Sequence, residues 1–168
     1  MRCLMGPEVG MNWQEFLVAA GNMYLFCDED SSVDTASPKE WIFSVGTKPL
    51  MWASVMEASA GIKAELFEGP TYSAIGSDLS AQCVAMNRAA PLAILSKVYG
   101  DPTVTGAGTR LAVARGGGTS ANDYASDVKS SAVGWVFKPD TKYLLRITPV
   151  KNTTQIIVRC PMGERDPE

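Results

Sequence analysis

The chain has 168 residues, of which 46% are hydrophobic and 20% are charged. A chain of this length and composition is expected to fold as one domain with a core that needs neither a metal nor a disulfide. Fifteen lysine and arginine residues against eighteen aspartate and glutamate residues give a formal net charge of -3. Because this balance lacks the basic excess that neutralises phosphates, we expect no nucleic-acid partner.

The sequence contains no histidine. This removes the commonest general base, the commonest metal ligand and every Ser-His or Cys-His nucleophile pair. We therefore expect a protein that is not an enzyme and that needs no cofactor. The chain has no apolar run of about 18 residues and no apolar leader segment, so we also expect synthesis in the cytoplasm and no membrane partner.

The four cysteines, Cys3, Cys27, Cys83 and Cys160, are far apart in the sequence and show no Cys-x-x-Cys spacing. Neither a zinc site nor a thioredoxin-type redox pair is therefore predicted. In a reducing cytosol we expect Cys27, Cys83 and Cys160 to be small buried apolar groups within or beside strands.

The first predicted element is a short helix near the N-terminus. Asn12 and Glu15 fit a capping box, Gly21 closes the helix, and one face carries the apolar residues Trp13, Phe16, Leu17 and Ala20. This face either covers one end of the core, which is the commoner role of such a face, or docks on a partner. We assign residues 1–22 to an N-terminal arm that contains the helix.

From Met23 onward, short alternating or apolar runs are separated by Pro, Gly, Asp and Ser clusters about every ten residues. This regular spacing of strand and turn signals predicts an all-β fold over residues 23–160, an antiparallel β-sandwich of the jelly-roll kind. We expect residues 161–168 to form a flexible C-terminal tail. We expect strands at Met23–Cys27, Trp41–Val45, Leu50–Met56, Ile62–Phe67, Leu92–Tyr99, Arg110–Ala114, Gly134–Phe137, Tyr143–Thr148 and Gln155–Cys160.

Two connections have sequences that predict their type. Lys138-Pro139-Asp140-Thr141 suits a type I turn, because proline presets the dihedral angle of the second position. Gly116–Asp127 is rich in Gly, Ser, Asn and Asp, which is typical of a long mobile loop.

An internal sequence repeat relates Pro70–Leu79 to Pro102–Leu111, 32 residues further along the chain. The two segments agree in type at Pro, Thr, Ser/Thr, Gly, Ser/Thr and Leu, and each follows a strand with an aromatic residue. Two copies are too few for a solenoid. They predict two similar strand-to-turn corners, in which Gly76 and Gly108 have comparable backbone positions with a positive φ.

Several segments match known ligand-binding motifs only in part. Oxygen-bearing side chains alternate as in an EF-hand loop at Asp28, Asp30, Ser32 and Asp34, but Val33 replaces the required glycine and Lys39 the bidentate glutamate. A solvated acidic turn explains this segment better than a calcium site. The glycine clusters at 106–108 and 116–118 lack the remaining residues of a phosphate-binding loop.

Three segments in fixed order resemble a known family. They are KAELFEGPT at Lys63–Thr71, a second corner at Asp101–Leu111, and GWVFKPDTKYLLR at Gly134–Arg146. They are similar to the ELxEGPTxTxxGT, xPTVTxxGTxL and WVLKPNTKYLxR stretches of small all-β virion proteins from tailed-bacteriophage structural gene clusters. The resemblance covers about Leu50–Val158. Relatives carry an Asn-rich stretch between Leu79 and Leu92, of which only Asn87-Arg88 is present, and the first fifty residues match no motif of the family.

The resemblance implies a capsid decoration, or head cement, protein on the outer surface of the virion, with the major capsid protein as partner. It leaves open self-association as a dimer or trimer. We expect the capsid contacts to involve Trp13 and Phe16 of the arm and Tyr124 of the Gly116–Asp127 loop, because termini and loops conform to a partner more easily than a closed core. The alternative is a carbohydrate- or receptor-binding module of a phage fibre or baseplate, with exposed tryptophan and tyrosine side chains as its platform.

Overall fold

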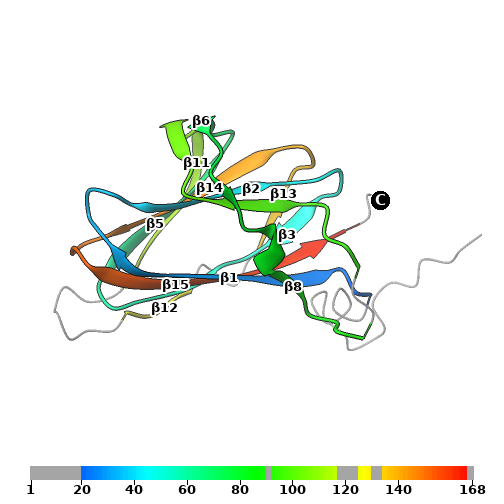
Figure 1. Ribbon diagram of the computed structural model, residues 1–168, viewed down its shortest axis with the longest axis horizontal. Coiled ribbons are helices and arrows are strands. Elements are labelled where there is room, and N and C mark those ends of the chain that lie inside the picture. The colour runs from blue at the N-terminus through cyan, green and yellow to red at the C-terminus, as the bar shows by residue number, and fades with distance from the viewer. Residues whose placement is uncertain (1–19, 90–91, 117–124, 130–133, 166–168) are drawn as a thin grey trace, which may run out of the picture.

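The computed structural model describes residues 20–89, 92–116, 125–129 and 134–165. Within these ranges the chain forms antiparallel sheets packed face to face, with a single 3-10 turn, η1 (Ser80–Gln82), and no α-helix (Figure 1). The predicted all-β sandwich is therefore confirmed. The predicted N-terminal helix falls on residues outside the described part of the chain.

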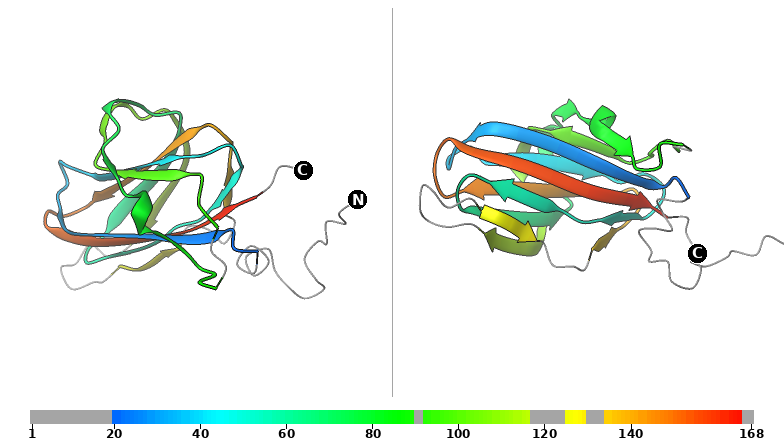
Figure 2. Two further views of the ribbon diagram at one scale, coloured as in Figure 1. Left: turned by 45° about the vertical axis from the view of Figure 1, so that its right-hand side comes forward. Right: turned by 90° about the horizontal axis from the view of Figure 1, so that it is seen from below.

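The first sheet has seven strands and is organised around two long neighbours, β1 and β15, which lie side by side in Figure 2. The strand order is β12-β4-β15-β1-β8, and β3 pairs with both β15 and β13. The bounds are β1 (Met23–Val33), β3 (Leu50–Trp52), β4 (Val55–Ala58), β8 (Cys83–Ala85), β12 (Ala125–Lys129), β13 (Trp135–Phe137) and β15 (Thr154–Glu164).

The second sheet has six strands in the order β11-β5-β14-β2-β9-β7. Its bounds are β2 (Lys39–Ser44), β5 (Ile62–Glu68), β7 (Ser77–Asp78), β9 (Lys97–Gly100), β11 (Thr109–Gly116) and β14 (Lys142–Pro149). Two further strands, β6 (Thr71–Ala74) and β10 (Thr103–Gly106), pair only with each other and stand out from the rest of the molecule (Figures 1 and 2).

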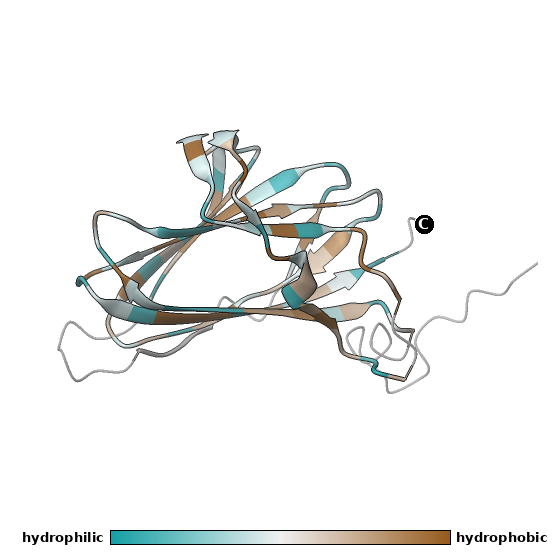
Figure 3. Cartoon of the chain, in the orientation of Figure 1, coloured by the Kyte–Doolittle hydropathy of each residue, from teal (hydrophilic) through white to brown (hydrophobic). Residues whose placement is uncertain are grey.

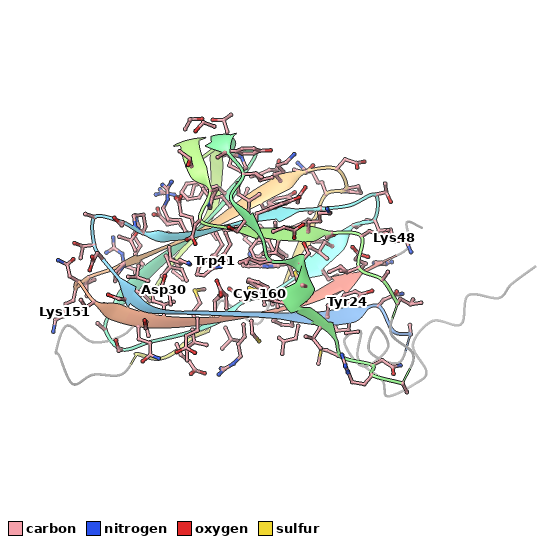
Figure 4. The ribbon with its side chains drawn as sticks, viewed as in Figure 1. Tyr24, Asp30, Trp41, Lys48, Lys151 and Cys160 are labelled. Carbon is pink, nitrogen blue, oxygen red and sulfur yellow. The ribbon has the colours of Figure 1, made fainter. Side chains whose placement is uncertain are left out.

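The core lies between the two sheets, because side chains alternate between the faces of each strand. Figure 3 shows the resulting alternation of hydrophobic and hydrophilic residues along the strands, and Figure 4 shows Trp41 and Cys160 between the sheets. A series of ring contacts crosses this interior and joins Phe26, Phe43, Trp52, Phe137 and Tyr143. Aromatic packing of this kind supplies a large part of the hydrophobic stabilisation.

Several predicted boundaries are corrected by the pairing between strands. β1 continues well beyond Cys27, because it pairs with β15 as far as Val33. The expected strand Leu50–Met56 is divided into β3 and β4, and β12 occupies part of the expected loop at Gly116–Asp127. Short polar strands such as β6 and β10 have no hydrophobic pattern of their own, so the sequence did not reveal them.

Two corrections concern the end of the chain and one turn. β15 runs to Glu164, which is buried, so the predicted boundary at residue 160 falls inside a strand and residues 161–164 belong to the sandwich. Residues 166–168 of the predicted tail lie outside the described residues. The predicted type I turn is wrong, because Asp140 has a φ of 52°, whereas that turn requires about -90° at this position.

Candidate interaction surface

The three residues predicted to contact a capsid, Trp13, Phe16 and Tyr124, lie outside the described residues, so the structure neither places them nor brings them together. Among the described residues, the most distinctive feature is instead the pair of corners that the internal sequence repeat predicts. We call Pro70–Leu79 and Pro102–Leu111 together the corner module.

The two corners pair with each other around a local twofold axis. β6 and β10 are antiparallel, and Tyr72 lies opposite Val104, its own equivalent 32 residues later. The flanking pairs follow the same symmetry. Thr109 lies opposite Glu68, and the residues equivalent to these two, Ser77 and Gly100, also lie opposite each other. Each corner is therefore held by the strand that leads into the other corner, and this mutual exchange was not expected from the sequence.

The glycines of the corners confirm their predicted equivalence. Gly76 has a φ of 94° and Gly108 a φ of 88°. A Cβ atom at Gly76 would lie 2.1 Å from the carbonyl oxygen of Gly100, and one at Gly108 would lie 2.2 Å from that of Glu68. Both positions thus require glycine for its dihedral angle and for the close approach of the opposite backbone.

The inner side of the module packs on the outer face of the second sheet. There it forms a separate apolar cluster around the buried side chains of Ile42, Phe67 and Leu144, joined by Tyr72, Ile75, Tyr99, Val104 and Ala107. Equivalent positions in this cluster differ in size: one corner supplies Tyr72 and Ile75 where the other supplies Val104 and Ala107. The module is therefore symmetric in its backbone but not in its core.

On the exposed side of the module, by contrast, equivalent positions carry similar side chains. Thr71 and Ser73 of one corner correspond to Thr103 and Thr105 of the other, and all four are exposed. Thr105 donates a hydrogen bond to the Oγ1 of Thr71 at 3.1 Å. Hydroxyl side chains thus recur at equivalent surface positions, where packing imposes no choice of residue, while the packed positions have diverged.

The three segments that carry the family resemblance lie largely, but not entirely, in this part of the fold. The first runs along β5 into β6, the second forms β10 and the start of β11, and the third covers β13 and the first half of β14. β11, β5 and β14 are neighbours in the second sheet, and Phe67 of β5 and Leu144 of β14 lie beneath the module. The first two motifs and the β14 part of the third therefore lie in one region of the fold, whereas β13 belongs to the first sheet.

The acidic turn is occupied by internal contacts. The Asp28 carboxylate accepts a 2.7 Å hydrogen bond from the Trp41 indole, and Lys39 lies between Asp30 and Asp101. The backbone N–H of Ser32 and the nearby Lys39 lower the pKa of Asp30. In the part of the chain that the structure describes, no group of three or more His, Cys, Asp or Glu side chains is arranged to hold a metal ion.

The three described cysteines are free thiols in different environments. Cys160 is fully buried and Cys83 is half-buried; burial raises the pKa of Cys83 to about 12, with a further contribution from Asp78, and raises that of Cys160 well above its ordinary value. Cys27 is exposed, so its predicted burial is wrong. It alternates with the inward-facing Phe26 and therefore points away from the core.

In the described part of the chain, the aromatic side chains offer little to a sugar-binding platform. Trp41, Trp52, Tyr24 and Tyr143 are buried, and among the described residues no aromatic side chain is fully exposed. An apolar cavity of about 40 Å³ lies between the sheets beside Trp52 and Trp135. Ligand pockets of proteins usually measure about 300 to 1,000 Å³, so this one is too small for a cofactor or a sugar.

Comparisons of the chain with protein-family models, curated proteins and solved structures give no significant match. Within the described ranges, no helix is long and apolar enough to cross a membrane. The class that the described residues define is an all-β antiparallel sandwich that carries an internally twofold corner module.

Proposed function

We propose that the protein is a capsid decoration protein of a tailed bacteriophage, which binds the outer surface of the major capsid protein lattice and reinforces the shell. The corner module is its lattice-facing element. Each copy needs to contribute little, because a contact repeated over a lattice must break many times before a shell opens.

One observation carries the proposal: the first two of the motifs that resemble those of phage virion proteins form the corner module and its flanking strands, and the third reaches β14, whose Leu144 packs under the module. Recurrence of exposed hydroxyl groups at Thr71, Ser73, Thr103 and Thr105 supports a binding role for its outer side. Shell reinforcement also suits a stable, largely preformed surface, because little conformational entropy is lost on binding.

Binding to preformed heads that lack the protein tests the proposal. The wild-type protein should bind in a copy number commensurate with the icosahedral lattice and should raise the resistance of the heads to heat. Arginine placed on the module, by Ser73→Arg or Thr105→Arg, should reduce occupancy by at least tenfold, since a bulky charge then occupies the contact. Ser31→Arg, at an exposed position of β1 in the other sheet, is the matched control and should bind normally.

The fibre or baseplate module is the competing function, and the same samples decide between the two. Protein found only on tails, or binding of glycan arrays by the wild type together with no occupancy of heads, would contradict the decoration role. Equal occupancy of heads by the Ser73→Arg, Thr105→Arg and Ser31→Arg variants would leave decoration standing but would remove the corner module as the docking element.

A further inference from the structure

Next to the corner module, the outer face of β5 and β11 carries cations around one buried carboxylate, that of Glu65. Register pairs Arg110 with Phe67, Val113 with Glu65, and Arg115 with Lys63 along this face. The Glu65 side chain is only 8% exposed, whereas that of Arg110 is 57% exposed. Solvent therefore meets the positive groups and not the carboxylate that lies among them.

Three ion pairs involve the two carboxylates of this region, Glu65 and Glu40. Glu65 accepts contacts from Lys63 at 2.8 Å and from Arg110 at 3.1 Å. Although burial alone would raise the pKa of Glu65, these two cations outweigh it and lower the pKa. On the neighbouring strand, Arg146 pairs with Glu40. Four cations thus face two carboxylates, which leaves local positive charge on a chain whose formal net charge is -3.

Arg115 is the residue that folding alone explains least. It lies directly opposite Lys63, and like charges in directly opposed positions of a sheet destabilise the pair. Arg115 is exposed, and it makes no ion pair with any residue whose side chain the structure describes. Val113, between Arg115 and Arg110 on the same face, is 52% exposed and adds an apolar contact to the charged strip.

We propose that Lys63, Arg110, Val113 and Arg115, which we call the basic strip, bind an acidic segment of a protein partner. The source of that segment rests on the proposed function: in a capsid decoration protein, it belongs to the outer surface of the coat protein. Charge complementarity selects an acidic partner, since carboxylates on it would supply the counter-charge that Arg115 lacks. The exposed Val113 favours a protein segment over a polyanion, and so few cations do not suffice for firm binding to DNA.

The test compares two charge reversals of equal size. Arg115→Glu removes a cation from the basic strip and places a glutamate opposite Lys63, so its melting temperature should be unchanged or higher. Lys97→Glu makes the same change on β9, at the far side of the second sheet. The exposed ion pair that Lys97 makes with Asp78 contributes little to stability, so this control should also remain folded.

Binding is measured to an oligo-glutamate peptide of about ten residues, to a DNA duplex of about 20 base pairs and to preformed heads, between 50 and 200 mM salt. We expect Arg115→Glu to weaken binding to peptide and heads about tenfold and to flatten its salt dependence, as reversal turns attraction into repulsion. Lys97→Glu should stay within about twofold of the wild type.

Three outcomes overturn the inference. These are equal effects of the two reversals on peptide and head binding, no binding of the wild type to the peptide at 50 mM salt, and tighter Arg115-dependent binding to the duplex than to the peptide. Failure of the proposed function is recognisable separately: the wild type would then bind the peptide through Arg115 but would not bind heads.

Discussion

At the scale of single residues, close backbone contacts explain why the corners need glycine. Gly76 and Gly108 have a positive φ, and in each case a backbone carbonyl oxygen of the opposite segment lies too close to leave room for a Cβ atom. Gly69 also has a positive φ, of 71°, but no atom lies within 4 Å of its Cβ position. Asp101, the equivalent of Gly69 in the second corner, carries a side chain at a φ of 53°.

This contrast gives a prediction with an internal control. Gly76→Ala and Gly108→Ala should each lower the free energy of unfolding by at least about 2 kcal/mol, because the backbone must move as well as accept an unfavourable φ. Gly69→Ala should lower it by only about 1 kcal/mol, from the dihedral angle alone. Urea denaturation measures all three, and equal losses would show that the close approach carries no weight.

Glu164 is a second residue whose importance depends on its contacts. Its carboxylate is buried and accepts hydrogen bonds from the backbone N–H groups of Leu95 and Ser96 and from the Ser96 hydroxyl. Three donors converge on this side chain, so it anchors the segment before β9 to the end of β15.

We predict that Glu164→Gln destabilises the protein by about 2 kcal/mol, because an amide nitrogen then faces donors and leaves them unsatisfied. The control is Glu57→Gln, which removes a half-exposed ion pair with Arg159 and should change stability by less than about 1 kcal/mol. Thermal and chemical denaturation of both variants provide the measurement. A loss at Glu57 equal to that at Glu164 would contradict the anchoring role.

At the scale of elements, the corner module behaves as two copies of one unit with complementary cores. Ile75 and Ala107 are equivalent positions that both face the cluster around Phe67 and Leu144. The larger side chain on one side of the axis compensates for the smaller one on the other, so the cluster is filled only when the two are considered together.

Exchange of the two side chains tests this complementarity. Ile75→Ala alone should lower stability by roughly 1 to 2 kcal/mol, because it leaves space in a half-buried cluster. In the double variant Ile75→Ala with Ala107→Ile the total volume is conserved, so the loss should fall below about 1 kcal/mol. If the double variant is less stable than Ile75→Ala, the two positions are not interchangeable and the twofold relation ends at the backbone.

At the scale of the whole molecule, charge contributes to stability through a few paired carboxylates. The pKa of Asp30 is lowered by the Ser32 N–H and Lys39, and the pKa of Glu65 is lowered by Lys63 and Arg110 despite burial. Groups with a lowered pKa in the folded state stabilise it above their ordinary pKa and lose that effect as the pH falls through the folded value.

The predicted pH profile follows from these signs. With no histidine in the chain, the free energy of unfolding should be nearly constant from about pH 6 to 8 and should decline below about pH 4.5. Asp30→Asn should make the acid decline shallower, because one of the linked groups is removed. Urea titrations at several pH values measure this, and a stability change centred between pH 6 and 7 would contradict the prediction.

The sequence by itself determined the features that depend on neighbours along the chain. The alternation of apolar and polar residues predicted strands such as β5 and β14. The internal repeat of Pro70–Leu79 in Pro102–Leu111 predicted two corners with a positive φ at Gly76 and Gly108. These features are local, because side-chain direction in a strand and the freedom of glycine are set by the backbone itself.

Only the tertiary structure decided which segments meet. Phe67 and Leu144 point away from the sandwich core yet are buried, because the corner module covers them. Mutual pairing of the corners brings segments 32 residues apart into register, and the basic strip arises where β11 lies beside β5. Such contacts depend on strand pairing between distant parts of the chain, which no local pattern of residues specifies.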